Sequence, residues 1–258
     1  YDPESPHAWL TLAVASAKAG DFQTAEAQVA RLPDSGLNRV VVPLAAAWIG
    51  LESSGLPTAV DRLDRLQELG GAEPLRQMHL GLLNEVAGDD EAADAIYDAL
   101  ALDPAVLSLR EVQIIGNFRQ RRGEGDAARA LYDAYVGATG TSLALEPAYA
   151  ALDDGGDVAP IVADAIDGLA EGLFDVAFLL QRQQAEDTSI VLTRNSIYLQ
   201  PDFAIAKIFL ADALARGERN EDAIEAYRAV PAGSGFDWQA RLEVARALDR
   251  LDRVDEAK

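Results

Sequence analysis

The fold is decided by residues 201–231, PDFAIAKIFLADALARGERNEDAIEAYRAVP. Apolar residues recur three and four positions apart in both halves, which is the period of an α-helix rather than a strand: Leu210, Ala211 and Leu214, then Ala223, Tyr227 and Val230. The polar turn ERNED separates the halves, and Asn220 within it is a candidate N-cap. Pro231 cannot continue the second helix. The stretch therefore predicts a hairpin of two amphipathic helices.

The same hairpin recurs along the chain with a period near 34 residues. Turn glycines lie at positions 20, 55, 88 and 123, at intervals of 35, 33 and 35. The small residue that opens each second helix lies at 25, 59, 92, 128, 189, 223 and 257, at intervals of 34, 33, 36, 61, 34 and 34. A single hairpin exposes apolar surface on several sides, so neighbouring hairpins must stack to bury it. We therefore expect an all-α solenoid.

One interval is too long for a single repeat, because 61 residues exceed the usual 34 by 27. The extra sequence contains Gly155-Gly156 between aspartates, followed by Pro160, a composition typical of a turn or linker. We expect four hairpins in residues 1–140 and two hairpins plus the start of a third in 168–258. Residues 141–167 are expected to form an irregular connector or a degenerate repeat that interrupts the superhelix.

Three segments carry a resemblance to a known family: AWLTLAVASAKAGDFQTAEAQVA, HLGLLNEVAGDDEAADAIYDALALDP and LADALARGERNEDAIEAY. They resemble tetratricopeptide (TPR) repeats over about residues 3–140 and 168–258. The resemblance implies a right-handed superhelical solenoid of antiparallel helix hairpins whose inner groove binds peptides or protein segments. The acidic, Arg-rich repeats also resemble those of alphaproteobacterial cell-envelope proteins. This implies a periplasmic or outer-membrane-associated location, with the cytoplasm as the alternative.

Composition excludes several classes of partner. The net charge of −21 opposes binding to nucleic acid or to an anionic membrane surface. No run reaches the ~18 apolar residues of a membrane span, so we expect no direct membrane insertion. The absence of cysteine excludes disulfides and thiolate metal sites. Because the chain begins at Tyr1 and stops at RVDEAK, which matches the start of a second helix, further hairpins are expected beyond it.

Reaction chemistry is not evident from the sequence. The two histidines, His7 and His79, lie far apart, and no phosphate-binding loop, dinucleotide fingerprint or nucleophile elbow is present. Residues Asp153 to Asp157 contain three carboxylates but lack the alternating ligands and distal Glu of a calcium loop. We therefore expect no catalytic residue, metal or cofactor.

The resemblance places a partner-binding groove on the first helices of the hairpins. Carried over to this sequence, it comprises Leu10, Val14, Ile49, Met78, Leu82, Gln113, Asn117, Gln120, Arg121, Phe174, Phe178 and Arg182. The apolar first part suits an amphipathic helix or an apolar peptide. The alternative is that flanking hairpins or a second copy of the chain cover this strip.

Function is therefore predicted as a non-catalytic scaffold or adaptor for a protein segment. Two alternatives stand beside it: a self-assembly module that forms homo-oligomers, or the repeat region of a larger enzyme whose catalytic domain lies elsewhere.

Overall fold

The computed structural model describes residues 6–140, 142–181, 185–253 and 255–256. Within these ranges the chain is all-α, with no strand. The helices of the first part are α1 (Pro6–Lys18), α2 (Phe22–Val29), α3 (Asn38–Ser54), α4 (Leu56–Leu63), η1 (Asp64–Glu68), α5 (Glu73–Ala87), α6 (Asp90–Leu100), α7 (Leu109–Arg121) and α8 (Gly125–Thr139). They are followed by η2 (Leu143–Leu145), α9 (Glu146–Asp154), α10 (Ala165–Gln181), α11 (Glu186–Leu199), α12 (Ala204–Arg216), α13 (Asn220–Arg228) and α14 (Asp237–Arg250). The predicted all-α solenoid is confirmed.

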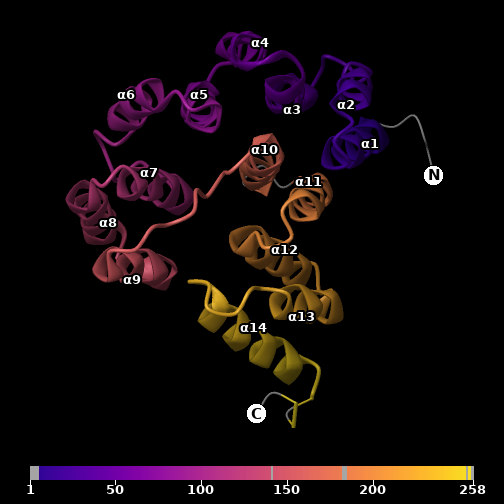
Figure 1. The fold of residues 1–258 in the computed structure, drawn as a ribbon. Coiled ribbons are helices and arrows are strands. Elements are labelled where there is room, and N and C mark those ends of the chain that lie inside the picture. Colours follow the sequence, from indigo (N-terminus) through magenta and orange to yellow (C-terminus); the bar gives the residue numbers. More distant parts are fainter. Residues whose placement is uncertain (1–5, 141, 182–184, 254, 257–258) are drawn as a thin grey trace.

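Helices α1 to α8 pack as four consecutive pairs that follow one another around an arc, which α9 extends (Figure 1). Two of the turns show why the sequence folds this way. Gly20 and Gly88 both adopt the left-handed conformation, with φ of 81°, which ends the preceding helix. The next residues, Asp21 and Asp89, then accept hydrogen bonds from backbone amides in the following helix, at 3.0 and 3.1 Å. The Gly-Asp pair thus ends one helix and caps the next.

The corresponding turn in 201–231 is built differently. Glu218 takes the left-handed conformation, at φ 58°, where the turns of the first, third and fourth hairpins have glycine. Arg219 is the N-cap residue of α13 and makes no side-chain cap bond. The prediction that Asn220 is the N-cap is therefore wrong; its side chain instead accepts a hydrogen bond from Arg250 Nε at 3.2 Å.

Glycines inside the helices mark where the two helices of a pair approach most closely. A Cβ added at Gly81 would lie 2.6 Å from the Tyr97 ring, and one at Gly116 would lie under 3.0 Å from the Tyr132 ring. Ala128 is fully buried beside this second contact, whereas Ala92 is only half-buried and its neighbour Ala93 takes the core position.

Enlarging these close contacts should destabilise the solenoid. We expect Gly116→Leu and Ala128→Leu each to lower the free energy of unfolding by about 1–3 kcal/mol or more, because Gly116 faces the buried Tyr132 ring and Ala128 is itself fully buried. Urea denaturation followed by circular dichroism measures this. Gly137→Leu is the control, since a Cβ there meets nothing within 4 Å. Equal midpoints for all three variants and the parent would contradict the assigned contacts.

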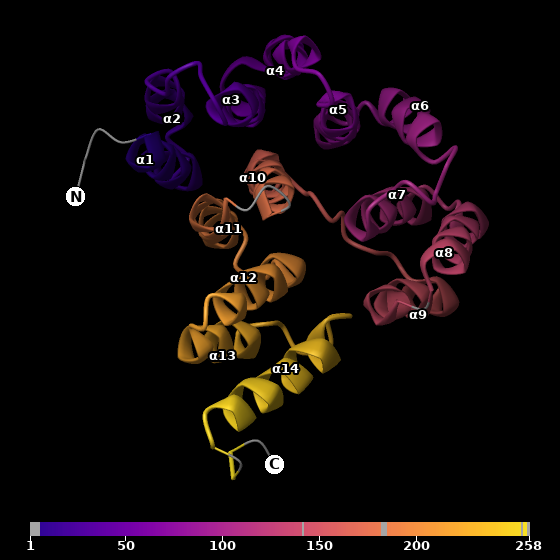
Figure 2. The same ribbon diagram turned by 180° about the vertical axis from the view of Figure 1, so that it is seen from behind.

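After α9 the chain leaves the arc. Residues 155–164 form no regular helix and carry the chain back to α10, which lies inside the arc beside α3 and α5 in both views (Figures 1 and 2). Helices α10 and α11 form a pair, α12 and α13 form the next, and α14 packs on α13. The largest hydrophobic cluster runs from Leu10 on α1 to Phe209 on α12, so the arc and the returning helices share one core. None of the described helices is long and apolar enough to cross a membrane.

The returning segment should be the preferred site of proteolysis. Residues 155–157, 159 and 160 are exposed, while Leu145 before them and Val162 after them are buried. We expect limited proteolysis to cut first between residues 155 and 160, because exposed backbone outside helices opens at the least cost. Mass spectrometry of the fragments identifies the site. First cleavage within α9, whose Tyr149 ring packs 5.5 Å from that of Tyr132, would show that the helix is not stably docked.

Candidate functional site

The inner side of the arc is filled by the chain itself. Helix α10 packs against α3 and α5, and α11 packs against α1. Small residues on α10 allow this approach: a Cβ at Gly168 would lie under 3.0 Å from the ring of Trp48, and one at Gly172 would lie 3.4 Å from His79 Cε1. These two glycines, four residues apart, face the same way along the helix. Two glycines four residues apart in a largely apolar helix are a sequence signal for close helix packing, and the repeat period alone does not reveal it.

Helix α11 is fastened to α10 by buried hydroxyl groups. Ser189 Oγ donates to the Ala177 carbonyl at 2.9 Å, and Ser196 Oγ donates to the Ala170 carbonyl at 2.8 Å. Both serines are fully buried. Bonds of this kind satisfy polar groups that would otherwise be costly inside a core. The α10–α11 pair is therefore joined by hydrogen bonds as well as by apolar packing.

This arrangement corrects the expectation of an open apolar groove. Six of the predicted groove residues are buried in the main hydrophobic cluster: Leu10, Val14, Ile49, Met78, Leu82 and Phe174. The first five lie on α1, α3 and α5, the helices that α10 and α11 cover, and Phe174 lies on α10. The physical reason is that an apolar strip on the inner side of a solenoid is best removed from water by whatever apolar helix can reach it. Here that helix belongs to the same chain.

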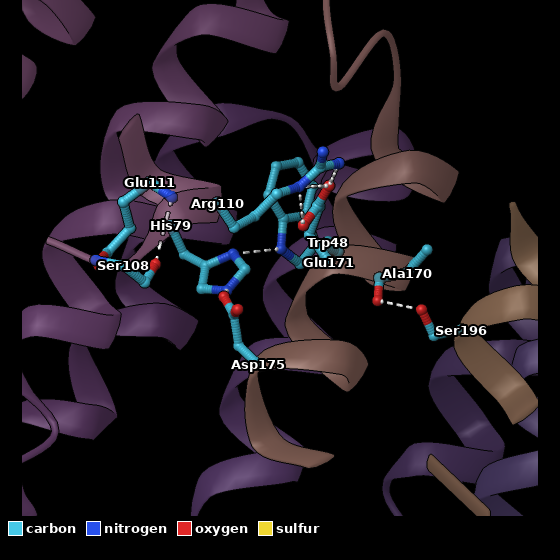
Figure 3. Close-up of polar contacts among 9 residues, drawn as sticks. All are labelled: Trp48, His79, Ser108, Arg110, Glu111, Ala170, Glu171, Asp175 and Ser196. Carbon is cyan, nitrogen blue, oxygen red and sulfur yellow. Dashed lines mark hydrogen bonds and ion pairs between the residues drawn. The ribbon is translucent and has the colours of Figure 1, made fainter. Parts of the chain in front are cut away.

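A buried polar network ties α10 to the arc (Figure 3). Trp48 Nε1 donates to His79 Nδ1 at 3.1 Å, which leaves Nε2 to donate to Asp175 Oδ2 at 3.2 Å. His79 is completely buried and has both ring nitrogens engaged. The network therefore fixes the ring in one neutral tautomer and positions α10 relative to α3 and α5.

A second pair in the same interface is ionic (Figure 3). Glu171 on α10 is almost wholly buried and accepts hydrogen bonds from Arg110 Nε at 3.0 and 3.2 Å, and another from its terminal nitrogen. Burial raises the pKa of the Glu171 carboxyl, and Arg110 acts in the opposite direction. The Arg110 guanidinium also lies 4.7 Å from the centre of the Phe203 ring. Arg110 is thus held by partners from two sides.

The polar part of the predicted groove lies elsewhere. Gln113, Asn117 and Gln120, all on α7, line a pocket of about 390 Å³. Arg121 instead pairs with Glu85. Phe178 is 44% exposed on α10, away from the pocket lining. Arg182 lies outside the described residues. The structure therefore brings together three of the twelve predicted residues at a cavity, and it buries six others.

The pocket lies where distant parts of the chain meet. Helices α7, α8 and α9 with residues 158 and 161 form one side, and residues 200–205 with the α13–α14 loop form the other. The two sides touch at Gly235, where an added Cβ would lie 2.5 Å from Ala144 Cα. Burial raises the pKa of Tyr132, in the pocket wall, to about 12. Sequence reasoning missed the lining residues from 200 to 236, because nothing local indicates that they face α7.

A wider recess adjoins the pocket and shares Pro147, Ser234 and Gly235 with it. Its volume is about 600 Å³, and its lining includes Leu143 of η2 and Trp238 of α14. These side chains are 52% and 67% exposed, respectively. We call this pocket and this recess together the seam site. It offers polar atoms inside and large apolar side chains at the opening.

Metal-binding chemistry is not assembled among the described residues: they contain no group of three or more His, Asp or Glu side chains placed to hold an ion. Asp153, considered above for a calcium loop, is instead paired with Arg129.

No protein-family model and no curated protein matches this sequence. Of 21 solved chains that match, one is the structure of "Assembly Chaperone of RpL4 (Acl4) (Residues 1-338)". It is similar over 98% of both chains, with 13% sequence identity and a TM-score of 0.28. At this TM-score the likeness supports no functional conclusion, so the function is considered from the chain's own residues.

Proposed function

We propose that this protein is a non-catalytic scaffold of the TPR-like superfamily and that it binds a segment of a partner protein at the seam site. The observation that carries the proposal is the exposed pair Trp238 and Leu143 at the mouth of a recess that leads into a polar pocket. Tryptophan contributes a large apolar area with one polar N–H, and it is strongly enriched among residues that dominate binding energy.

The setting of Trp238 supports this role. The recess is lined by elements 90 residues apart in sequence, Leu143 to Pro147 and Gly233 to Trp238. Their close approach at Gly235 and Ala144 holds the two walls together before any partner arrives. Preformed walls lower the entropy lost on binding. The inner groove on α1, α3 and α5 is covered by α10 and α11 and would not compete for the same segment.

The absence of a catalytic role is part of the same proposal. His79, the more central of the two histidines, has both ring nitrogens in hydrogen bonds within the core. A general base needs a nitrogen within reach of a substrate proton. A cell-envelope location remains a prediction from the sequence resemblance.

Site-specific photo-crosslinking tests the proposal. A benzophenone amino acid is placed at position 238 or, as the control, at position 102, where Leu102 is 85% exposed and does not line the seam site. Both proteins are illuminated in cells that naturally produce the chain. We expect a discrete adduct with another protein at position 238. This adduct should disappear when the same chain without the benzophenone is produced in excess in those cells. The same adducts at both positions would overturn the proposal. An adduct of the chain with itself would establish the self-assembly alternative instead.

A further inference from the structure

Buried polar atoms without partners are concentrated in one place. Among the described residues, four buried side-chain oxygens have no hydrogen-bond partner: those of Gln28, Gln113, Gln200 and Ser234. Three of these four line the pocket of the seam site. A buried polar group left unpaired costs roughly 1–3 kcal/mol, so native proteins contain few of them and rarely place several together. Their concentration marks the wall of this pocket as the place where hydrogen-bond acceptors are left unsatisfied within the chain.

The orientation of Gln113 is determined by its other amide atom. Gln113 Nε2 donates to the Ala144 carbonyl at 3.0 Å, so Oε1 cannot turn away without breaking that bond. One turn later, Asn117 Nδ2 donates to the Ala159 carbonyl, also at 3.0 Å, and its Oδ1 accepts from Arg121. Helix α7 thus already holds backbone carbonyls of its own connector through side-chain amides. Of these two side-chain amides on α7, only the oxygen of Gln113 accepts no hydrogen bond.

The charge of the lining disfavours anionic ligands. Its two charged residues are Arg110 and Asp202, which are of opposite sign, and the guanidinium of Arg110 is already paired with Glu171. No cation is therefore left to attract an anionic ligand. The rest of the lining is largely small or apolar, including Ala148, Ala151 and Ile161. An uncharged ligand with N–H donors and small side chains matches these walls.

We propose that the pocket binds an extended, uncharged peptide segment through its backbone N–H groups, with the side-chain oxygens of Gln113 and Gln200 as the acceptors and Ser234 Oγ beside them. This rests on the proposed function and names the chemistry by which the partner segment is recognised. A peptide backbone supplies donors at regular spacing, and each bond formed removes the desolvation cost of one buried acceptor. Small side chains of the segment occupy the alanine-lined wall.

The probe is the acetylated, amidated tetrapeptide of alanine, compared with the same peptide methylated at its backbone nitrogens. Binding to the full chain is followed by NMR through the side-chain amide signals of Gln113 and Gln200. We expect the unmethylated peptide to shift these signals in a saturable manner. The methylated peptide, which has lost those N–H donors, should have at least about tenfold weaker affinity.

Three variants localise the effect. Gln200→Met and Ser234→Ala each remove a proposed acceptor in the pocket, and each should weaken tetrapeptide binding by about threefold to tenfold. Gln28→Met is the matched control, because it removes the one unpaired oxygen that lies outside the pocket. It should leave binding unchanged. Melting temperatures at or above that of the parent would verify that these variants fold.

Equal shifts with both peptides, or full binding by Gln200→Met and Ser234→Ala, would overturn the inference. Failure here can be distinguished from failure of the scaffold proposal. An adduct at position 238 without any tetrapeptide binding would reject the pocket and leave the scaffold. Tetrapeptide binding that depends on Gln200, without any adduct at position 238, would retain the pocket and reject the protein-binding role of the recess.

Discussion

Gly168→Ala is expected to destabilise the protein by about 3 kcal/mol or more, although it adds a single methyl group. The new Cβ would lie under 3.0 Å from three atoms of the Trp48 ring. Trp48 is fully buried, and its Nε1 is held by His79. The ring therefore has no free space to move into, and relief requires α10 to shift away from α3. Urea denaturation measures the loss.

Two other glycines calibrate this expectation. Gly172→Ala places a Cβ at ordinary contact distance, 3.4 Å from His79 Cε1, and should cost far less than Gly168→Ala. Gly137→Ala lies on the exposed surface of α8 with nothing within 4 Å, and should stabilise by up to about 1 kcal/mol through helix propensity. If the Gly168→Ala variant were as stable as the Gly137→Ala variant, then α10 could not lie against Trp48. The packing of α10 on the inner side of the arc would then be wrong.

Arg110→Met is expected to destabilise the protein by about 3–5 kcal/mol, because it leaves the buried carboxylate of Glu171 without its cation. The double variant Arg110→Met with Glu171→Met should recover most of this loss, since no charge is then left in the interface. Arg129→Met is the matched control: it breaks the exposed pair with Asp153 and should cost about 0–1 kcal/mol. A loss of similar size for Arg110→Met and Arg129→Met would contradict the buried pairing.

The pH dependence gives this prediction a definite sign. Burial raises the pKa of Glu171, and Arg110 opposes that rise, so removing Arg110 should raise the pKa further in the folded state. A carboxyl whose folded pKa lies above its unfolded value destabilises the fold when ionised, and the penalty disappears as pH falls through the folded pKa. The deficit of Arg110→Met relative to the parent should therefore shrink from about pH 7 toward about pH 5. A deficit that grows on acidification would overturn this assignment.

The return of α10 also has a consequence for binding. A solenoid normally presents its inner surface to partners, but here the chain covers the apolar part of that surface and leaves a polar pocket beside it. Under the proposed function, a partner binds where the connector, α7 and the α13–α14 loop meet, and not on the first three hairpins. Binding specificity would then depend on hydrogen bonds and on Trp238 more than on an apolar strip.

The sequence by itself determined the helical hairpins and their turns. The period of three and four residues, and the Gly-Asp pairs at 20–21 and 88–89, act within a few residues of one another, so they are readable without a tertiary structure. The irregular interval predicted an interruption within residues 141–167; in the structure α9 still extends the arc, and the chain leaves it at residues 155–164. For the candidate site, the resemblance to TPR repeats indicated Gln113, Asn117 and Gln120, which line the pocket.

Only the tertiary structure decided what lies on that inner side. The same apolar pattern on α1, α3 and α5 is consistent with a bound partner or with a covering helix of the same chain. The free energy gained depends on the apolar area removed from water, whichever chain supplies the covering surface. In this chain α10 covers that surface, because its glycines pack closely against Trp48 and His79 and its Glu171 accepts hydrogen bonds from Arg110. These are contacts between residues 61 to 120 positions apart, and no local pattern encodes their geometry. The seam site follows from that choice, since it forms only once α10 has brought residues 200–236 back to face α7.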